Sequence, residues 1–233
     1  MNFVLHYQMA SFQFKKVFRN VELKFYLSIL IIAIMVVFIT DLSQSPNVST
    51  DFRDSVFQAT SLLTCTGFVS SDYNHWATDA KLILLLVMVI GGCVGSTSGG
   101  IKIRRIVVVF YMLKRYVINL VHPKAIAQMQ FDGTLVTTER FRRIVGFIFI
   151  YFLTIIVGTF VLMFSNLDLR TSLSAVVTTL GGVGPGFGLV GPMDNFALLS
   201  DFNKIYLCFN MILGRLEILP VLAIFQLMFR RGI

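Results

Sequence analysis

The sequence predicts an all-α integral membrane protein built from two similar units. Three observations support this fold class: the composition, four long apolar runs, and a short amphipathic segment inside each half of the chain. Of the 233 residues, 56% are hydrophobic and 14% are charged, whereas soluble domains contain about 25% charged residues. The composition therefore excludes an ordinary soluble globule and a disordered chain.

Four apolar runs are long enough, with their flanks, to cross a bilayer as helices. A helix rises 1.5 Å per residue, so about 20 residues span the hydrocarbon core. The runs are Phe25–Thr40, Leu82–Ile101, Ile144–Leu167 and Ile205–Phe229. Only the last contains charged side chains near its middle, and they are Arg215 and Glu217.

Two shorter segments, Asp51–Phe68 and Asp168–Gly188, separate the runs within each half. Each is too short to cross the membrane and ends in glycine and threonine, which favours a re-entrant half-helix. A shift of 117 residues places Asp, Arg, Ser, Leu and Gly of the first segment over the same residue types in the second. The sequence therefore predicts the order span, half-helix, span, and then a repeat of it.

The basic residues collect on one side of this arrangement. Fifteen lysines and arginines precede the first run, lie between the second and third, or follow the fourth, and only four lie on the other side with eight acidic residues. By the positive-inside rule both termini are cytoplasmic. We therefore expect a multi-pass protein of the inner (plasma) membrane. This topology explains the net charge of +8, so we do not expect nucleic acid as a partner.

Small residues follow each half-helix, at Thr64–Phe68 and Gly181–Gly186. Glycine accepts backbone angles that other residues resist, and a ring of backbone carbonyls can replace the hydration shell of a monovalent cation. Asp72 and Asp79 would raise the cation concentration at the outer mouth. The alternative interpretation is a pair of structural turns between helices.

The second run contains five glycines within Gly91–Gly100. Each weakens a helix by about 1 kcal/mol relative to alanine, or about 5 kcal/mol in total. This favours a break in the helix and a flexible intramembrane loop that acts as a gate. The alternative is a continuous helix that packs closely through its small residues.

Arg215 would cost about 2.5–3.5 kcal/mol in the middle of a span, so we expect it to face a cavity or a partner. Residues two positions apart do not face each other on a helix, so Arg215 and Glu217 require separate partners. Arg215 is either a cationic barrier beneath an ion pathway or a structural residue paired with a neighbouring helix. No catalytic triad or metal-ligand spacing is recognisable, and we do not expect an enzyme.

The chain resembles the TrkH potassium-uptake family. The stretches that carry the resemblance are Thr64–Phe68, Gly91–Lys102, Gly184–Gly186 and Asn210–Glu217, together with Asn2–Tyr7. The resemblance implies a potassium-channel-like fold of membrane–pore-helix–membrane repeats, four of which surround one pore in the family. This chain is similar to the third and fourth repeats.

The resemblance also implies roles for individual residues. Potassium, with no organic cofactor, would bind the filter carbonyls of Cys65, Thr66, Gly67, Phe68, Gly182, Val183, Gly184 and Pro185. The gating loop would contain Gly91, Gly92, Gly95, Ser96, Thr97, Ser98, Gly99 and Gly100. Arg215 would be the pore barrier beneath the filter.

The predicted organisation has four parts. Residues 1–23 form a cytoplasmic N-terminal segment, 24–120 the first repeat with a broken second span, 121–140 a cytoplasmic linker, and 141–233 the second repeat. The resemblance implies membrane lipid, a homodimer of complete pores and a cytosolic nucleotide-binding TrkA-type subunit as partners. The missing first-half repeats or a second copy of this chain would complete the pore.

The sequence therefore predicts potassium transport through a carbonyl-lined filter, by half of a Trk-type protein. Two alternatives remain open. One is a secondary ion and solute transporter with broken helices, for which Glu217 is the candidate titratable group at the membrane midplane. The other is a non-conducting remnant or interaction subunit.

Overall fold

The computed structural model of the chain describes residues 3–42, 48–122, 130–131, 134–135 and 137–230. Within these ranges the protein is helical apart from one pair of two-residue antiparallel strands, β1 (Gln130–Phe131) and β2 (Thr134–Leu135). The helices are α1 (Phe3–Ala10), α2 (Phe14–Arg19), α3 (Val21–Leu42), α4 (Val48–Leu63), α5 (Thr78–Ile90), α6 (Ile103–Val121), α7 (Thr138–Met163), α8 (Leu169–Gly181), α9 (Asp201–Leu216) and α10 (Ile218–Arg230). Three short 3₁₀ turns complete the described structure: η1 (Tyr73–His75), η2 (Gly188–Val190) and η3 (Phe196–Leu198).

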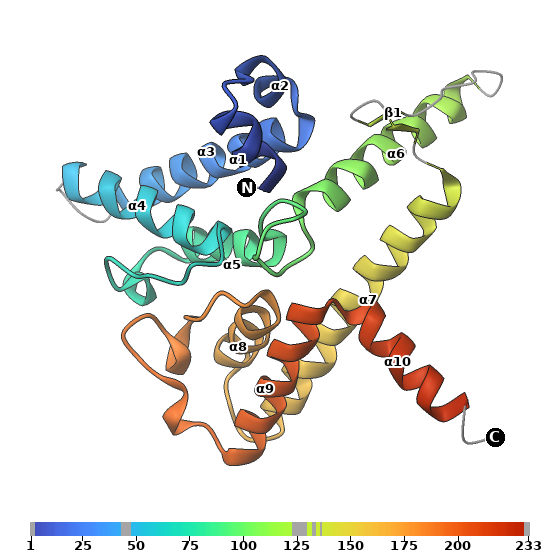
Figure 1. Ribbon diagram of the computed structural model, residues 1–233. Coiled ribbons are helices and arrows are strands. Elements are labelled where there is room, and N and C mark those ends of the chain that lie inside the picture. The colour runs from blue at the N-terminus through green and yellow to red at the C-terminus, as the bar shows by residue number, and fades with distance from the viewer. Residues whose placement is uncertain (1–2, 43–47, 123–129, 132–133, 136, 231–233) are drawn as a thin grey trace.

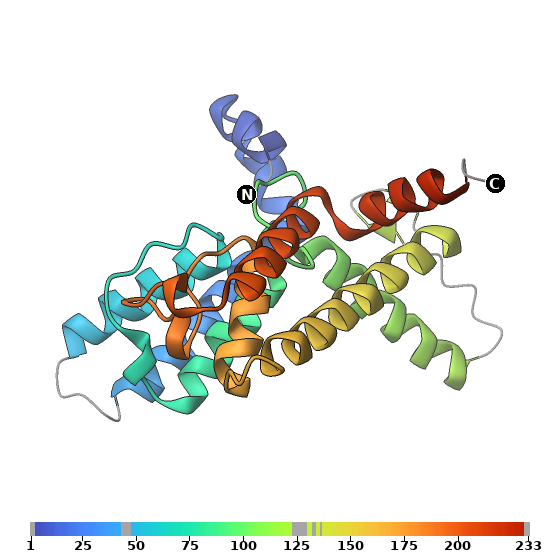
Figure 2. The ribbon, with the colours of Figure 1, turned by 90° about the horizontal axis from the view of Figure 1, so that it is seen from below.

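The helices form two units of the same kind. In each unit a long helix packs against a shorter one, and a third helix follows after an extended loop: α3, α4 and α5 in the first unit, and α7, α8 and α9 in the second (Figure 1). Helices α5 and α8 contact each other and join the two units. Helix α6 and the N-terminal part of α7 extend away from the rest of the bundle in both views (Figure 2).

Two helices in the described part of the chain are long and apolar enough to cross a membrane. They are Val21–Leu42 and Thr138–Met163, with mean hydropathies of 2.5 and 2.6. They overlap the first and third predicted runs. The second run is divided between α5, a loop and the start of α6.

The fourth run is also divided, which the sequence analysis did not predict. Helix α9 ends at Leu216, Glu217 has a φ of +61°, and α10 begins at Ile218. Pro220 explains the break, because proline has no N–H to donate and its ring clashes with the carbonyl four residues earlier in a continuous helix. Proline is tolerated in the first turn of a new helix, which is its position in α10.

The predicted linker at 121–140 lies partly outside the described residues, since 123–129, 132–133 and 136 are not among them. The predicted N-terminal segment, residues 1–23, contains α1, α2 and the start of α3 from residue 3 onwards.

Helix α8 lies at the centre of the second unit. Its residues from Thr171 to Gly181 are buried apart from the half-buried Leu173. The Asp168 carboxylate caps its first turn by accepting the Thr171 N–H at 3.2 Å, and Gly182 ends it in the left-handed conformation. The sequence thus encodes a short helix with a defined beginning and end.

Two glycines allow other segments to approach the C-terminal end of α8. A Cβ atom on Gly214 of α9 would lie 1.9 Å from the Leu180 carbonyl oxygen, and one on Gly99 would lie 2.2 Å from the Gly181 carbonyl oxygen. Side chains are therefore excluded at both positions, and α8 meets bare backbone.

We predict that Gly214→Ala destabilises the protein by about 2 kcal/mol or more, because the new methyl group overlaps a backbone carbonyl that cannot rotate away. The thermal unfolding midpoint of the detergent-purified protein measures this. Gly146→Ala in α7 is the matched control, since nothing lies within 4 Å of its added Cβ, and it should raise stability by about 0.5–1 kcal/mol. Equal midpoints for the two variants would contradict the close packing at α8.

Candidate functional site

The two predicted filter segments have residues with a positive φ at equivalent positions. Cys65 has a φ of +56° and its counterpart Gly182 a φ of +64°, while Gly67 and Gly184 have φ values of +75° and +120°. Each pair is separated by the 117 residues that the sequence alignment indicated. Left-handed residues thus alternate with ordinary ones in both segments, which turns the chain sharply after each half-helix.

A hydroxyl group of the preceding helix fixes the far end of each segment. Ser61 Oγ donates to the Phe68 carbonyl at 2.6 Å, and Thr178 Oγ1 donates to the Pro185 carbonyl at 3.0 Å. Ser61 and Thr178 also stand 117 residues apart, as do Phe68 and Pro185. Two different side chains therefore make the same hydrogen bond at equivalent positions.

The hydrogen bonds at the near ends of the two segments also correspond. Ser61 accepts through its carbonyl from the Thr66 N–H at 2.9 Å, and Thr178 accepts in the same way from the Val183 N–H at 2.9 Å. Thr178 Oγ1 also accepts from the Gly184 N–H at 2.9 Å. Both segments are therefore held at two points by the last turns of their own half-helix.

The structure brings the two segments together. A Cβ atom on Gly67 would lie 2.2 Å from the Val183 carbonyl oxygen and 3.3 Å from Pro185 Cδ. The eight predicted filter residues thus lie in two adjacent backbone segments. Four of these residues are exposed: Thr66, Phe68, Gly182 and Gly184.

The glycine-rich run forms a closed loop between α5 and α6. The Ile101 N–H donates to the Val89 carbonyl at 3.1 Å, and the Lys102 N–H donates to the Ile90 carbonyl at 2.9 Å. A Cβ atom on Gly91 would lie 2.3 Å from the Gly99 carbonyl oxygen. The two ends of the loop are therefore packed together, and a continuous helix is excluded at this position.

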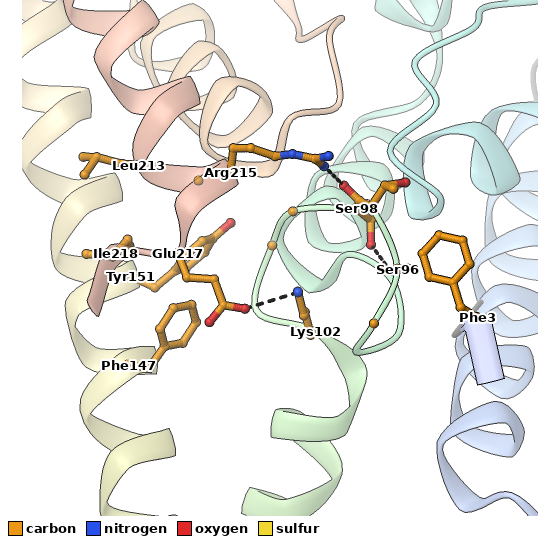
Figure 3. Close-up of a pocket in the computed structure, with 15 residues that line it drawn as sticks. Phe3, Ser96, Ser98, Lys102, Phe147, Tyr151, Leu213, Arg215, Glu217 and Ile218 are labelled. Carbon is orange, nitrogen blue, oxygen red and sulfur yellow. Dashed lines mark hydrogen bonds and ion pairs between the residues drawn. The ribbon is translucent and has the colours of Figure 1, made fainter. Parts of the chain in front are cut away.

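Three other parts of the protein hold the loop. The Val94 N–H donates to Glu22 Oε1 of α3 at 2.6 Å, and the Gly99 N–H donates to the Gly181 carbonyl of α8 at 3.1 Å. The Arg215 guanidinium of α9 donates to the Thr97 carbonyl (Figure 3). The position of the loop thus depends on both units.

Glu217 has a different set of partners from Arg215. The spacing of the two residues on one helix predicted separate partners, but α9 ends between them, at Leu216. The Glu217 carboxylate lies 3.2 Å from Lys102 Nζ and 2.6 Å from Arg105 Nη2 (Figure 3 shows the lysine contact). The Arg105 guanidinium also lies over the Phe147 ring, 3.8 Å from its centre. The break after α9 is therefore fixed electrostatically to the end of the loop and to the start of α6.

Two cavities meet at Arg215. One, of about 360 Å³, lies between the loop and the end of α9, and the other, of about 480 Å³, extends to Gly181 and Gly182 at the base of the second filter segment. Thr97, Gly99 and Arg215 line both of them. Lys102 and Glu217 also line the first cavity, and Gly181 and Gly182 the second, so Arg215 borders both spaces.

Asp72 and Asp79, the two acidic residues predicted at the outer mouth, have different surroundings. Asp72 Oδ1 accepts the Asn74 N–H at 2.9 Å and caps η1, while Asp79 lies exposed in the first turn of α5. No group of three or more His, Cys, Asp or Glu residues within the described residues could hold a metal ion.

Sequence reasoning missed several residues of this site. Glu22 precedes an apolar run and gives no local sign that it reaches the loop, and Asn74 likewise gives none that it contacts the second unit. Pro220, by contrast, is a visible sign of the break after α9 that the sequence analysis did not use.

Comparison with known proteins places the chain in a family. The features compared are its two helical units and the backbone segments that follow α4 and α8. Residues 17–232 match the TrkH family, described as cation transport protein, and the chain belongs to this family.

Individual relatives agree with this assignment. The Trk system potassium uptake protein TrkG of Escherichia coli K12 is 35% identical over 236 residues, which cover 99% of this chain and 48% of that protein. The Trk system potassium uptake protein TrkI of Halomonas elongata is 34% identical over 230 residues, or 98% of this chain and 47% of the relative. The crystal structure of the potassium transporter TrkH from Vibrio parahaemolyticus superimposes with a TM-score of 0.86 at 30% identity, covering 96% of this chain and 48% of that one. The chain spans about half the length of the relatives it matches.

We predict that Glu217→Gln destabilises the protein by about 1–3 kcal/mol, because it leaves the half-buried Lys102 and Arg105 without a counter-charge. Thermal unfolding of the purified protein measures this change. Glu139→Gln is the control, since Glu139 pairs with Arg143 on the exposed surface of α7, and such a pair contributes about 0.3–0.5 kcal/mol. Losses of the same size in both variants would contradict the role of Glu217.

Proposed function

We propose that this chain transports potassium across the inner membrane as half of a Trk-type uptake pore. The observation that carries the proposal is the pair of filter segments, which have positive φ values at equivalent positions, share one hydrogen-bond pattern and lie side by side. A pair of unrelated turns would have no reason to repeat both features. The names of the relatives, Trk system potassium uptake proteins, favour potassium as the transported ion.

In the proposed topology the chain crosses the membrane four times. Helices α3 and α7 are unbroken spans, α5 with α6 and α9 with α10 are broken spans, and α4 and α8 are re-entrant pore helices. The first repeat then occupies 24–120 and the second 141–233, with a cytoplasmic segment at 1–23 and a cytoplasmic linker at 121–140. Both termini are cytoplasmic, in agreement with the distribution of basic residues.

The proposed potassium ligands are the backbone carbonyls of the filter segments. Their inner and middle positions are Cys65, Thr66, Gly67, Gly182, Val183 and Gly184. The carbonyls of Phe68 and Pro185 already accept hydroxyl hydrogen bonds, so we assign them to the end of the filter, where an ion is held least tightly. Carbonyl oxygens in this arrangement replace the water that a monovalent cation loses on entry.

Two segments supply half of a closed ring of carbonyls. The ring would be completed at the edge formed by four exposed residues, Thr66, Phe68, Gly182 and Gly184. We propose the missing first-half repeats, or a second copy of this chain, as the completing partner. Complete pores would form a homodimer in lipid and bind a cytosolic nucleotide-binding TrkA-type subunit.

The loop from Gly91 to Gly100 is the proposed gate, and Arg215 the proposed barrier. Arg215 lines both cavities, one of which extends to the base of the second proposed filter segment, and its guanidinium donates to the Thr97 carbonyl of the loop. Its positive charge opposes the passage of a cation through the same space. Glu217 already has two cationic partners, which disfavours the alternative in which it is the coupling group of a secondary transporter.

We predict that Gly67→Ser abolishes transport, because it adds a side chain where the Val183 carbonyl lies and at a φ that favours glycine. The measurement is rubidium uptake and growth at low potassium of a strain without its own uptake systems, with this chain expressed alone or with a first-half chain. Gly146→Ser in α7 is the control and should transport normally.

Each outcome of this experiment has a distinct meaning. Rescue by the chain alone would show that two copies complete a pore, and rescue only with the partner would show a split transporter. The absence of rescue in both cases, with the protein inserted in the membrane, would overturn the proposed function and support the non-conducting alternative. Normal uptake by Gly67→Ser would overturn the filter assignment.

We predict that Arg215→Ala increases rubidium uptake per folded protein, since it removes both the barrier charge and the bond that holds Thr97. Uptake is measured in the same strain and divided by the amount of folded protein from size-exclusion chromatography. Arg142→Ala on the exposed surface of α7 is the control. Unchanged or lower uptake by Arg215→Ala would assign a purely structural role to this arginine.

A further inference from the structure

The outer loop of the first unit reaches into the second unit at Asn74. Its carboxamide makes two hydrogen bonds with the backbone of one residue: the Gly188 N–H donates to Asn74 Oδ1 at 3.0 Å, and Asn74 Nδ2 donates to the Gly188 carbonyl at 3.2 Å. The Asn74 side chain thus makes the pair of hydrogen bonds that the backbone of a neighbouring β-strand would make with Gly188. The two residues are 114 positions apart in the chain.

Other residues orient the carboxamide for this contact. Arg170 Nη2 donates to Asn74 Oδ1 at 3.1 Å and to its backbone carbonyl at 3.3 Å, and Lys81 Nζ donates to the same carbonyl at 2.9 Å. The Asn74 N–H is bonded to Asp72 Oδ1. Because Arg170 only donates, the atom that it contacts must be the oxygen of the amide, and the nitrogen faces the Gly188 carbonyl.

The surrounding space fits this side chain closely. A Cβ atom on Gly191 would lie 2.0 Å from Asn74 Nδ2, so the second unit has no side chain at the point of contact. Beside Asn74, the buried Tyr73 ring packs edge-to-face on Phe187 at 5.2 Å between centres. Two adjacent residues of the first unit therefore contact the same loop of the second.

Gly188 belongs to the segment that leads away from the second filter. One face of α8 fixes this segment through three hydroxyl side chains: Thr178 bonds Gly184 and Pro185, Ser174 bonds the N–H and carbonyl of Phe187, and Thr171 accepts the Leu189 N–H at 3.2 Å. All three come from the second unit. Asn74 bonds the residue between Phe187 and Leu189, and it does so from the first unit.

We propose that Asn74 is a positioning residue for the second filter segment, through which the first unit sets the spacing of the filter and thereby its discrimination between potassium and sodium. This inference rests on the proposed transport function. Without the carboxamide, the side-chain hydrogen bonds to this segment described above come from its own helix alone, so the distance between the two filter segments is less strictly defined.

A measurement that does not depend on transport tests the positioning. Amide hydrogen exchange of the purified full chain should show about two- to tenfold faster exchange for the Gly188 amide in Asn74→Ala, the factor expected for loss of one ordinary hydrogen bond. Asn74→Asp, which is isosteric and retains the acceptor oxygen, should show a smaller increase. Asn195→Ala is the matched control, because exposed Asn195 caps its own turn by accepting the Ala197 N–H.

A second measurement tests discrimination. The ratio of rubidium to sodium uptake, in the combination of chains that restores growth, should fall in Asn74→Ala and Asn74→Asp and stay unchanged in Asn195→Ala. Unchanged exchange at Gly188 would overturn the positioning. Faster exchange with an unchanged uptake ratio, in variants whose unfolding midpoints match the parent protein, would overturn the link to discrimination. No uptake by the unsubstituted chain, alone or with a first-half chain, would overturn the proposed function and the discrimination with it, while the exchange result would still decide the contact.

Discussion

The rest of the structure depends on the contact between bare backbone and the C-terminal end of α8. The Gly181 carbonyl accepts a hydrogen bond from Gly99 of the loop, and the Leu180 carbonyl lies against Gly214 of α9. The filter segment begins one residue later, at Gly182. Loop, filter and broken helix therefore meet at one turn of one short helix, and no side chain separates them. A displacement of any one of these elements changes the space available to the other two.

Much of this arrangement follows from local sequence. The half-helices, their 117-residue offset and the break at Gly91–Gly100 were predictable, because capping, glycine content and apolar length act over a few residues. The partners of the charged and amide groups were not. Arg105 and Glu217 are 112 residues apart, and Asn74 and Gly188 are 114 apart. Such pairs are determined by how two units pack, and a single sequence contains no periodic signal for that. The break after α9 was partly predictable, because Pro220 indicates a break but the apolar run around it suggests a continuous helix.

Of the cationic side chains Lys102, Arg105 and Arg215, which lie beside the loop in the described structure, only Arg215 has no ion pair with an acid. Lys102 and Arg105 share the Glu217 carboxylate, and Arg105 is also covered by the Phe147 ring. Arg215 is bonded to a carbonyl, which satisfies a donor but cancels no charge. A full positive charge therefore remains in the cavities beside Thr97.

The break at Glu217 has a mechanical consequence. Helices α9 and α10 are joined by a single residue with a left-handed φ, so they can rotate about that point while each remains rigid. Glu217 is the residue at this joint, and its carboxylate forms an ion pair with Lys102, where the loop ends and α6 begins. Because Glu217 is ion-paired with Lys102 and Arg215 donates to the Thr97 carbonyl, a displacement of α10 or α6 would be transmitted to the middle of the loop. The end of α9 and the break that follows it thus contact the loop at two separate points, its middle and its end.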